Sequence, residues 1–554
     1  MRDPAVGSVA PGQNKFAPRC QDSASGFHKR ELSTVGRFAR AIYTSCSARR
    51  LSSGSPGCYR ICENFHKSFG SPQTTRFDEL NPNHPALPAP FTPETLRGLP
   101  LQPIFGHIVP FMKDPLGFFT RCAREHGDLV PMTFFGHTEY LVSHPDLVEQ
   151  ILATQHRSYV KPAVFQRHVS RQIFGNGLVA SEGDFWLKQR RLAQPAFHRE
   201  RVDGYAGTMV EFTRQLLADW RPGETRDVHS DMMRLTLRIA VKTLFDQELG
   251  DRADRIGKSF ERVVEEYARA EFGLFSILEG KAPTPSSIRR RRPIATLNRE
   301  IQRVIEERRT SSEDRGDLLS MLMSVRDDED RGMSDRQLRD EVMTFFVAGH
   351  ETTALALSWA FYLLGGDPSV RLRVDQEITS VLGDRLPSAD DVERLPVCRA
   401  VIHESMRLYP PVWAMGRAAG EEVRLGNHTF PATTQFYMSQ WVIQRDERFW
   451  PRADKFLPDR WLDGSESLRP RFAFFPFGGG PRRCIGQAFG LMEAVLILAT
   501  VAREFRLQPL VGLEPRPRAL LTLRPDGGVR VRVERPISLA HNGSGNGAGY
   551  RSPD

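Results

Sequence analysis

The fold is decided by Phe477-Gly-Gly-Gly-Pro-Arg482-Arg483-Cys484-Ile-Gly486, which leads directly into an apolar, helical stretch over 487–501. Its glycines and proline predict a loop whose backbone passes close to a flat ligand, and Gly486 leaves room on the same side. We expect Cys484 at the N-terminus of the following helix, where free N–H groups and the helix dipole lower the pKa of a thiol and favour a metal-binding thiolate. The alternative is a buried core thiol behind a glycine-rich turn, which is the commoner case for an isolated cysteine.

The spacing of this stretch resembles the haem-binding loop of the cytochrome P-450 family, the haem-thiolate monooxygenases, and in particular their bacterial-type soluble members. The match rests on Phe477, Gly480, Arg482, Cys484 and Gly486. The resemblance implies that Cys484 is the axial ligand of the iron of haem b, and that Phe477, Arg482 and Gly486 also bind this cofactor. An axial thiolate sends electron density to haem iron and so favours O–O cleavage.

Glu404 and Arg407 stand in a predicted helix over 397–408, where their i, i+3 spacing places them on one face. Such a pair is usually a solvated surface pair. In the family it is joined by a second arginine, which here is Arg460 in Phe456-Leu-Pro-Asp-Arg460-Trp461. The resemblance therefore implies that Glu404, Arg407 and Arg460 are structural: a buried carboxylate between two arginines clamps the segment that delivers the cysteine loop.

A longer helix is predicted from a capping box at Ser334 to a stop signal at Gly365-Gly-Asp-Pro368. Its middle, Ala348-Gly-His-Glu-Thr-Thr353, is unusually polar. Glycine beside threonines weakens the helical hydrogen bonds, because hydroxyls bond back to i−4 carbonyls, and this predicts a kink with a polar groove. A zinc-protease motif is excluded, because Ala354 stands where the second histidine is required.

Two interpretations of Glu351 and Thr352 remain open at this point. The threonines are either ordinary core residues with their hydroxyls turned to the backbone, or functional groups. In the family, A-G-x-[DE]-T is the oxygen-activation segment, and this sequence matches it at Ala348, Gly349, Glu351 and Thr352. The resemblance implies that Glu351 and Thr352 are catalytic and form an acid–alcohol proton relay.

Trp186 and Arg190 are four residues apart on a predicted helix, so both can face one ligand. Basic helices are more often solvated faces. The family pattern W-x-x-x-R assigns this pair to a haem propionate, and Arg417 resembles a further propionate-binding position. Residues 91–536 hold all these motifs in the family's order.

The resemblance implies a mainly α fold with small β-sheets, in which one large domain carries a long, kinked central helix over the haem. The chain has 554 residues, 40% of them hydrophobic, which is enough for a large core. We place a proline-rich linker at 78–103, the catalytic domain at 104–536 and a disordered tail at 537–554. Further helices are predicted at 201–220, 232–245, 254–278 and 293–309, strands at 134–142, 423–430 and 434–438, and an exposed loop at 287–292, which holds four consecutive arginines.

The first residues differ in character from the rest. Residues 1–62 hold ten lysines and arginines against three acids, a net +7 of the chain's +9, and four of the seven cysteines. This composition is typical of a mitochondrial transit peptide, but we favour a disordered, non-essential extension or non-native start over 1–77. The basicity is therefore no argument for nucleic-acid binding. No run of 18 apolar residues occurs, so we expect no transmembrane anchor and a cytoplasmic location, with mitochondrial import as the alternative.

By resemblance, the function is hydroxylation or epoxidation of an apolar substrate, such as a fatty acid, terpenoid or polyketide of secondary metabolism, with O2 and two electrons. Seventy residues follow Cys484, too few for a flavin reductase, and no dinucleotide fingerprint is found. We therefore expect a monomer that receives electrons from a separate ferredoxin or flavodoxin and its reductase. Lys188, Arg191 and Arg483 are candidates for a basic docking face, with solvated surface charge as the alternative.

The substrate pocket is expected to be large and apolar. The positions that resemble pocket-lining regions of the family are Phe165, Phe174, Leu178, Phe346, Val412, Trp413, Met415 and Leu521. Two other functions remain alternatives: a haem-thiolate isomerase or peroxygenase, against which the intact Glu351-Thr352 pair argues, and a non-catalytic haem-binding sensor.

Overall fold

The central helix α14, Asp335–Gly366, organises the structure. It begins at the predicted cap, because the Ser334 side chain accepts a hydrogen bond from the Gln337 N–H at 3.2 Å and satisfies a donor of the first turn. It ends at the predicted stop and is buried along most of its length, as expected of a helix surrounded by others. The helix is unbroken between these ends, and the kink stays a prediction.

The structure is a computed structural model, and it describes residues 106–134, 136–166, 168–250, 252–272, 282–311, 315–324 and 332–536. All of these belong to one compact unit of the chain, Thr75–Asp554. The extension predicted over 1–77, the linker over 78–103 and the tail over 537–554 lie outside the described residues.

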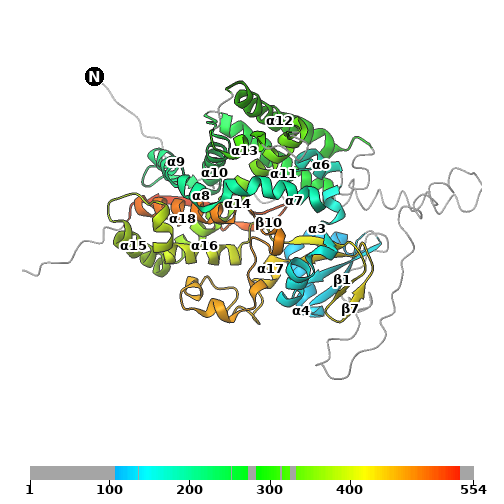
Figure 1. Cartoon of the computed structure of the whole chain (residues 1–554). Coiled ribbons are helices and arrows are strands. Elements are labelled where there is room, and N and C mark those ends of the chain that lie inside the picture. Colours follow the sequence, from blue (N-terminus) through cyan, green and yellow to red (C-terminus); the bar gives the residue numbers. More distant parts are fainter. Residues whose placement is uncertain are drawn as a thin grey trace, which may run out of the picture. The chain divides into compact units, whose positions relative to one another are not determined.

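Most other elements are helices packed around α14. Figure 1 shows α10 to α13 above α14 in that view, and α15, α16 and α18 below it. The helices are α3 Ile108–Lys113, α4 Pro115–His126, α5 Pro145–Glu149, α6 His168–Phe174, α7 Gly183–Ala193, α8 Arg199–Gly204, α9 Ala206–Ala218, α10 Val228–Phe245, α11 Arg252–Phe272, α12 Pro285–Ser311, α13 Leu318–Ser324, α15 Pro368–Leu382, α16 Pro396–Leu408, α17 Gln440–Ile443 and α18 Gln487–Glu504.

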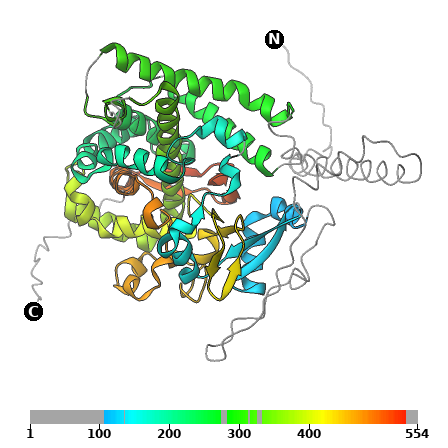
Figure 2. The same cartoon turned by 45° about the vertical axis from the view of Figure 1, so that its right-hand side comes forward.

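The main sheet has five strands in the order β1-β2-β8-β5-β3. It joins distant parts of the chain, and Figure 2 shows its blue N-terminal strands beside its yellow ones. Strand β2 pairs in parallel with β8, which pairs antiparallel with β5 and so places Arg417 opposite Phe436. The five strands are β1 Leu129–Phe134, β2 His137–Val142, β3 Tyr159–Val160, β5 Met415–Ala419 and β8 Gln435–Met438.

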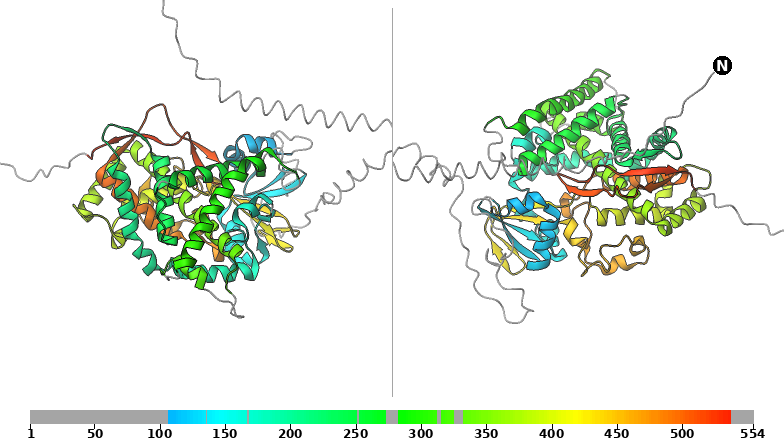
Figure 3. Two further views of the ribbon diagram at one scale, coloured as in Figure 1. Left: turned by 90° about the horizontal axis from the view of Figure 1, so that it is seen from above. Right: turned by 180° about the vertical axis from the view of Figure 1, so that it is seen from behind.

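Three smaller sheets complete the described structure. The C-terminal strands, red in Figure 3, lie along α14, which contacts both β9 and β11. The sheets pair β4 Thr225–Asp227, β12 Arg530–Glu534 and β9 Arg506–Pro509; β10 Arg516–Ala519 and β11 Leu523–Asp526; and β6 Val423–Leu425 and β7 His428–Phe430.

The predicted helices are confirmed in kind, and two local predictions are wrong. The segment 423–430 is a tight hairpin, β6 and β7, rather than one strand. The arginines at 289–292 lie in α12 rather than in an exposed loop, because the helix runs through Pro293, where the sequence suggested a helix start. Arg290 is buried and donates a hydrogen bond to Gln172 Oε1 at 3.0 Å, so this arginine belongs to the core.

The end of α14 offers a matched pair of glycines that tests this packing. A Cβ on Gly365 would overlap the Leu507 carbonyl of β9 and the ring of Pro509, whereas a Cβ on Gly366 would meet nothing within 4 Å. We predict that Gly365→Ala lowers the free energy of unfolding by roughly 1–3 kcal/mol, because β9 must move. Gly366→Ala is the control, expected to be neutral or stabilising by up to about 0.5 kcal/mol. Equal denaturant midpoints for the two variants would contradict this packing.

Candidate functional site

The cysteine loop is a short, folded turn at the start of α18. The Cys484 N–H donates a hydrogen bond to the Phe477 carbonyl at 2.9 Å, which closes the loop, and Gly486 is the cap residue of α18. Cys484 is exposed, whereas the other two cysteines of the described chain, Cys122 and Cys398, are buried. Cys484 is therefore the exposed cysteine among the described residues.

Glycine is required within this loop at position 480. Gly480 has a φ of +63°, in the left-handed region, and a Cβ there would overlap the Leu152 carbonyl oxygen. The loop is thus pressed against the turn Gln150–Thr154. This close approach sets the position of the cysteine relative to the rest of the fold.

The protonation of Cys484 differs from the sequence prediction. Although part of the residue is exposed, the surrounding protein desolvates the thiol and raises its pKa, while the Gly486 N–H, Arg190 and Arg483 act in the opposite direction. The expected lowering is therefore present but outweighed by desolvation. A bound metal ion would deprotonate the thiol outright, because the ion is the largest local charge.

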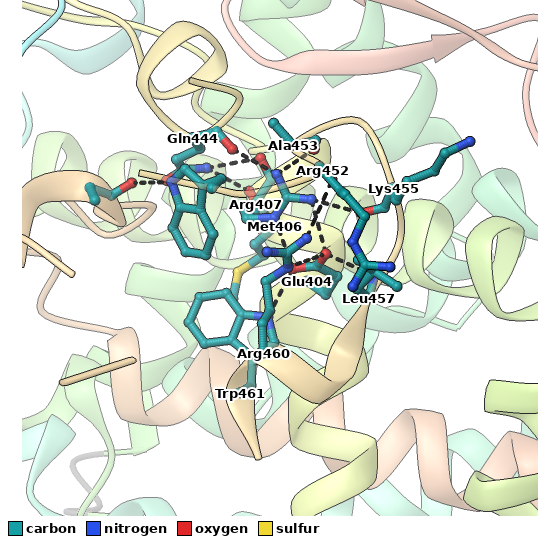
Figure 4. A network of polar contacts seen from close by, with 12 residues as sticks. Glu404, Met406, Arg407, Gln444, Arg452, Ala453, Lys455, Leu457, Arg460 and Trp461 are labelled. Atoms are coloured by element: carbon teal, nitrogen blue, oxygen red, sulfur yellow. Dashed lines mark hydrogen bonds and ion pairs between the residues drawn. The ribbon is translucent and has the colours of Figure 1, made fainter. Parts of the chain in front are cut away.

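The carboxylate of Glu404 lies at the centre of a buried polar network (Figure 4). Its two oxygens accept hydrogen bonds from Arg407 Nε at 2.8 Å and Nη2 at 2.9 Å, from Arg460 Nε at 3.1 Å, from Trp461 Nε1 at 2.9 Å and from the Leu457 N–H at 2.9 Å. Glu404 and Arg407 have no exposed surface. Burial of these charges is tolerated because every lone pair finds a donor.

The same network reaches the cysteine loop. Arg407 also donates to the backbone carbonyls of Gln444, Ala453 and Lys455, at 2.8, 2.7 and 3.0 Å. The Gln444 side chain accepts a hydrogen bond from the Phe475 N–H at 3.2 Å, two residues before the loop begins. Helix α16 is thereby connected to the segment that delivers Cys484, as the predicted clamp requires.

A cluster of half-buried cations lies beside the loop. Arg482 stacks over the Trp186 ring at 4.2 Å from its centroid, donates to the Ser181 carbonyl at 3.1 Å and forms an ion pair with Glu182. Glu182 also accepts a hydrogen bond from the Lys161 N–H at 2.7 Å. Lys161 and Glu182 were not predicted from the sequence, where nothing distinguishes them from surface charges.

The cluster holds more positive than negative charge. Burial and the neighbouring Arg482 lower the pKa of Arg417 to about 10, and burial together with Arg482 lowers that of Lys161 well below its ordinary value. Glu182 is the carboxylate that opposes these shifts for Arg417, and for Lys161 it does so with Glu341. Three close cations are stabilised by additional anions, so this donor set fits the two propionate groups of a haem.

Arg190 is oriented differently from the predicted propionate ligand. Its Nη1 donates to the Arg483 carbonyl at 2.7 Å, and its Nε to Gln194 at 3.2 Å. Arg190, on helix α7, therefore fixes the backbone next to Cys484. Its role at a propionate stays a prediction.

Glu351 and Thr352, adjacent on α14, have different partners. Glu351 is 1% exposed, and its Oε1 accepts hydrogen bonds from Thr522 Oγ1 at 2.9 Å and Arg524 Nε at 2.6 Å. Thr352 is half-buried, and its hydroxyl donates to the Ala348 carbonyl at 2.9 Å. Thr522 and Arg524 were not predicted from the sequence, because no local pattern connects β11 and the residue before it with α14.

The two halves of the site are brought together where α18 packs on α14. A Cβ on Gly490, six residues after Cys484, would lie 3.5 Å from Thr353 Oγ1. The cysteine loop and the Glu351-Thr352 segment are therefore neighbours.

The predicted pocket residues vary in environment. Trp413 packs on Phe111 and Phe119 and donates to the Leu520 carbonyl at 2.9 Å. Phe346 packs on the His350 ring, with centroids 5.8 Å apart. Phe174, Leu178, Phe346 and Trp413 are buried; Phe165, Val412, Met415 and Leu521 are half-buried. Their contact with a substrate stays a prediction.

Comparison with known proteins agrees with this geometry. The cytochrome P-450 family model matches residues 96–531. Cyclooctat-9-en-7-ol 5-monooxygenase of Streptomyces melanosporofaciens is 38% identical over 426 residues, which cover 76% of this chain and 91% of that protein. Cyclooctatin synthase of the same organism is 37% identical over 433 residues, covering 77% and 93%. Pentalenene oxygenase of Streptomyces avermitilis is 34% identical over 432 residues, covering 78% and 95%.

The exposed cysteine, the cationic cluster and the polar segment of α14 are features that a haem-thiolate oxygenase site requires. The chain belongs to the cytochrome P-450 family. It is accordingly a haem-thiolate monooxygenase of apolar substrates, which uses O2 and electrons from a redox partner. Within the part of the chain that the structure describes, none of the helices combines the length and apolar character needed to cross a bilayer.

The Glu404 network predicts a large stability effect. Glu404→Gln replaces one oxygen that accepts hydrogen bonds with an amide NH2 group that faces arginines. It also leaves the buried positive charges of Arg407 and Arg460 without a compensating negative charge. We expect the free energy of unfolding to fall by about 3–5 kcal/mol. The control is Glu393→Gln, which disrupts an exposed ion pair with Arg399 and should cost less than about 0.5 kcal/mol. Chemical denaturation of both variants measures their free energies of unfolding. Similar losses of this free energy would refute the central role of Glu404.

Proposed function

We propose that this monooxygenase hydroxylates or epoxidises a terpenoid-class substrate. The support is twofold. Two relatives that align over nearly their whole length are named for the oxidation of cyclooctat-9-en-7-ol and pentalenene, and the predicted pocket residues are large and apolar. Fatty acids and polyketides fit the pocket chemistry equally well and are the alternatives that a ligand screen separates.

The chain's own residues hold the cofactor and its surroundings. Cys484 would present the thiolate, Gly480 lets the loop lie against the turn Gln150–Thr154, and Lys161, Arg417 and Arg482 would neutralise the propionates. The bound haem supplies O2 activation and the transfer of one oxygen atom to the substrate. The observation that supports this assignment best is the half-buried excess of positive charge beside an exposed cysteine.

Proton delivery to the site is assigned to Thr352 and Glu351. The Thr352 hydroxyl holds a proton at Oγ1, on the half-buried side of α14, and passes it on when its bond to the Ala348 carbonyl opens. Glu351 replenishes this proton after its carboxylate leaves Arg524 and Thr522 and takes up a proton from solvent water, which it then transfers to the threonine oxygen. A positioned acid of this kind typically contributes 10²–10⁴-fold to the rate.

Electrons are proposed to arrive from a ferredoxin or flavodoxin at the face formed by α7 and the cysteine loop. Lys188, Arg191 and Arg483 are all exposed there, and Arg190 connects the two elements through the Arg483 carbonyl. Positive charge at this place would steer an acidic partner toward the cysteine. The monomeric state, the absence of nucleic-acid binding and the cytoplasmic location, with mitochondrial import as its alternative, stay predictions.

The first functional prediction concerns Cys484. Cys484→Ser removes the thiolate, so the reduced protein should lose the red-shifted carbon monoxide band of haem-thiolate proteins. Cys122→Ala, which changes a buried core thiol of α4, should keep that band. Absorption spectra of the purified, reduced proteins make the comparison. A Cys484→Ser protein that keeps the band would refute iron ligation by this residue.

The second functional prediction concerns Thr352. Thr352→Ala should reduce product formed per NADPH by roughly a hundredfold, while NADPH oxidation continues, because proton delivery is lost. The assay uses a surrogate ferredoxin system and an apolar compound that shifts the Soret band of the wild type. Thr310→Ala is the control, since Thr310 makes the same i−4 hydrogen bond on the exposed face of α12. Unchanged coupling would remove Thr352 from the relay, and turnover with peroxide alone would favour a peroxygenase.

A further inference from the structure

Three consecutive residues of α14, Arg339, Asp340 and Glu341, all bond to one segment. That segment runs from the end of α6 toward α7 and includes Leu178, a predicted pocket residue. The motifs that carry the family resemblance do not include these three residues, and the proton relay does not use them.

Arg339 holds the end of α6. It donates to the Gln172 and Ile173 carbonyls, at 3.3 and 3.4 Å, and forms an ion pair with Asp340 at 2.7 Å. Carbonyls at a helix C-terminus attract cations, because the helix dipole is negative there. Arg339 thus fixes the start of the segment by electrostatic attraction.

Asp340 holds the next residues. Its Oδ2 accepts a hydrogen bond from the Asn176 N–H at 2.8 Å. Gly175 has a φ of +53°, and a Cβ there would overlap the Asp340 carboxylate. The segment therefore approaches α14 as closely as a backbone without a side chain allows.

Glu341 and Lys161 hold Leu178 from two sides. Glu341 Oε2 accepts a hydrogen bond from the Leu178 N–H at 2.9 Å, and its Oε1 accepts one from Gln337 Nε2 at 2.7 Å. Lys161 Nζ donates to the Leu178 carbonyl at 3.2 Å and to the Val179 carbonyl. Both backbone polar groups of Leu178 are thus bound by ionisable side chains, one buried and one half-buried.

The segment lies along α14 on the way to the oxygen-activation segment. A Cβ on Gly177 would overlap Thr344 Oγ1, and Thr344 is eight residues before Thr352. Eight residues of helix span about 12 Å. The segment is therefore well placed to form a side wall of the space next to Thr352.

The Glu341 carboxyl is sensitive to pH in the physiological range. Burial, with a smaller contribution from Asp340, raises its pKa to about 7, although the Leu178 N–H, Gln337 and Lys161 act in the opposite direction. If the wall moves away, water reaches the carboxyl and its pKa returns toward 4.5. The closed wall therefore binds the proton more tightly, so raising the pH through 7 favours opening.

We propose that Arg339, Asp340 and Glu341 position the segment Gly175–Leu178 as a wall of the haem pocket, and that Glu341 sets how readily this wall opens to bulky ligands. Glu341 is a positioning residue, because it acts through the backbone of Leu178. The inference rests on the proposed placement of Leu178 beside the haem.

The test is the rate at which azoles bind the ferric holoprotein, followed by the Soret shift in stopped flow between pH 6 and pH 8. Clotrimazole is the bulky probe and imidazole the small one. The wild type is compared with Glu341→Gln, which keeps an oxygen for the Leu178 N–H but does not titrate. Asp335→Asn, an exposed carboxylate at the start of α14, is the matched control.

For clotrimazole, the ratio of the wild-type rate to the Glu341→Gln rate should rise with pH, by at most about tenfold. The azole's own protonation cancels in this ratio. The ratio for imidazole, and the ratio of wild type to Asp335→Asn for either probe, should stay flat. A flat clotrimazole ratio overturns the proposal. Should the haem iron not be ligated by Cys484, the reduced carbon monoxide complex of the wild type lacks the red-shifted band, so failure of the proposed function is recognised separately.

Glu341→Ala provides the complementary result. Loss of the hydrogen bond to Leu178 should increase the clotrimazole association rate severalfold and leave that of imidazole unchanged. An equal change for both probes would mean a general loosening of the fold rather than release of this wall. If the alanine variant does not fold, the pH profile of the glutamine variant still decides.

Discussion

The buried carboxylate of Glu404 is the constraint on which the site depends. It accepts five hydrogen bonds from α16 and from the 457–461 segment, and Arg407 carries the network on to the backbone at Gln444, Ala453 and Lys455. Charges without exposed surface are stable only when all their hydrogen bonds are made, so this network permits little movement. Through Gln444 and Phe475 that rigidity reaches the loop that presents Cys484.

The cationic cluster beside the loop has the opposite character. Lys161, Arg417 and Arg482 are brought together with too little negative charge. Desolvation lowers all three pKa values, and Arg482 lowers those of Lys161 and Arg417 further by repulsion. The Glu404 network is complete within the protein, whereas this cluster becomes complete when an anionic cofactor binds. Binding of haem is therefore expected to stabilise the fold as well as to supply the chemistry.

Helix α14 connects these two regions to the pocket. Its first turns hold the wall segment through Arg339, Asp340 and Glu341, its middle carries Glu351 and Thr352, and its end packs on β9. Each contact is made to a different part of the chain, and the helix is unbroken from Asp335 to Gly366. One stiff element thus sets the relative positions of the segment Gly175–Leu178, the Glu351-Thr352 pair and the cysteine loop.

The sequence by itself determined the family, the helices with strong caps and the residues that belong to contiguous motifs, such as Cys484, Glu404 and Thr352. These features are local, because caps, i, i+3 spacing and glycine-rich turns depend on neighbours along the chain. Tertiary structure alone decided the partners of those residues. Arg524 binds Glu351, Lys161 joins Arg417, Glu341 holds Leu178 and Arg290 enters the core. A charged side chain carries no local sign of whether it will be solvated or buried, and its partner is chosen when distant segments pack together.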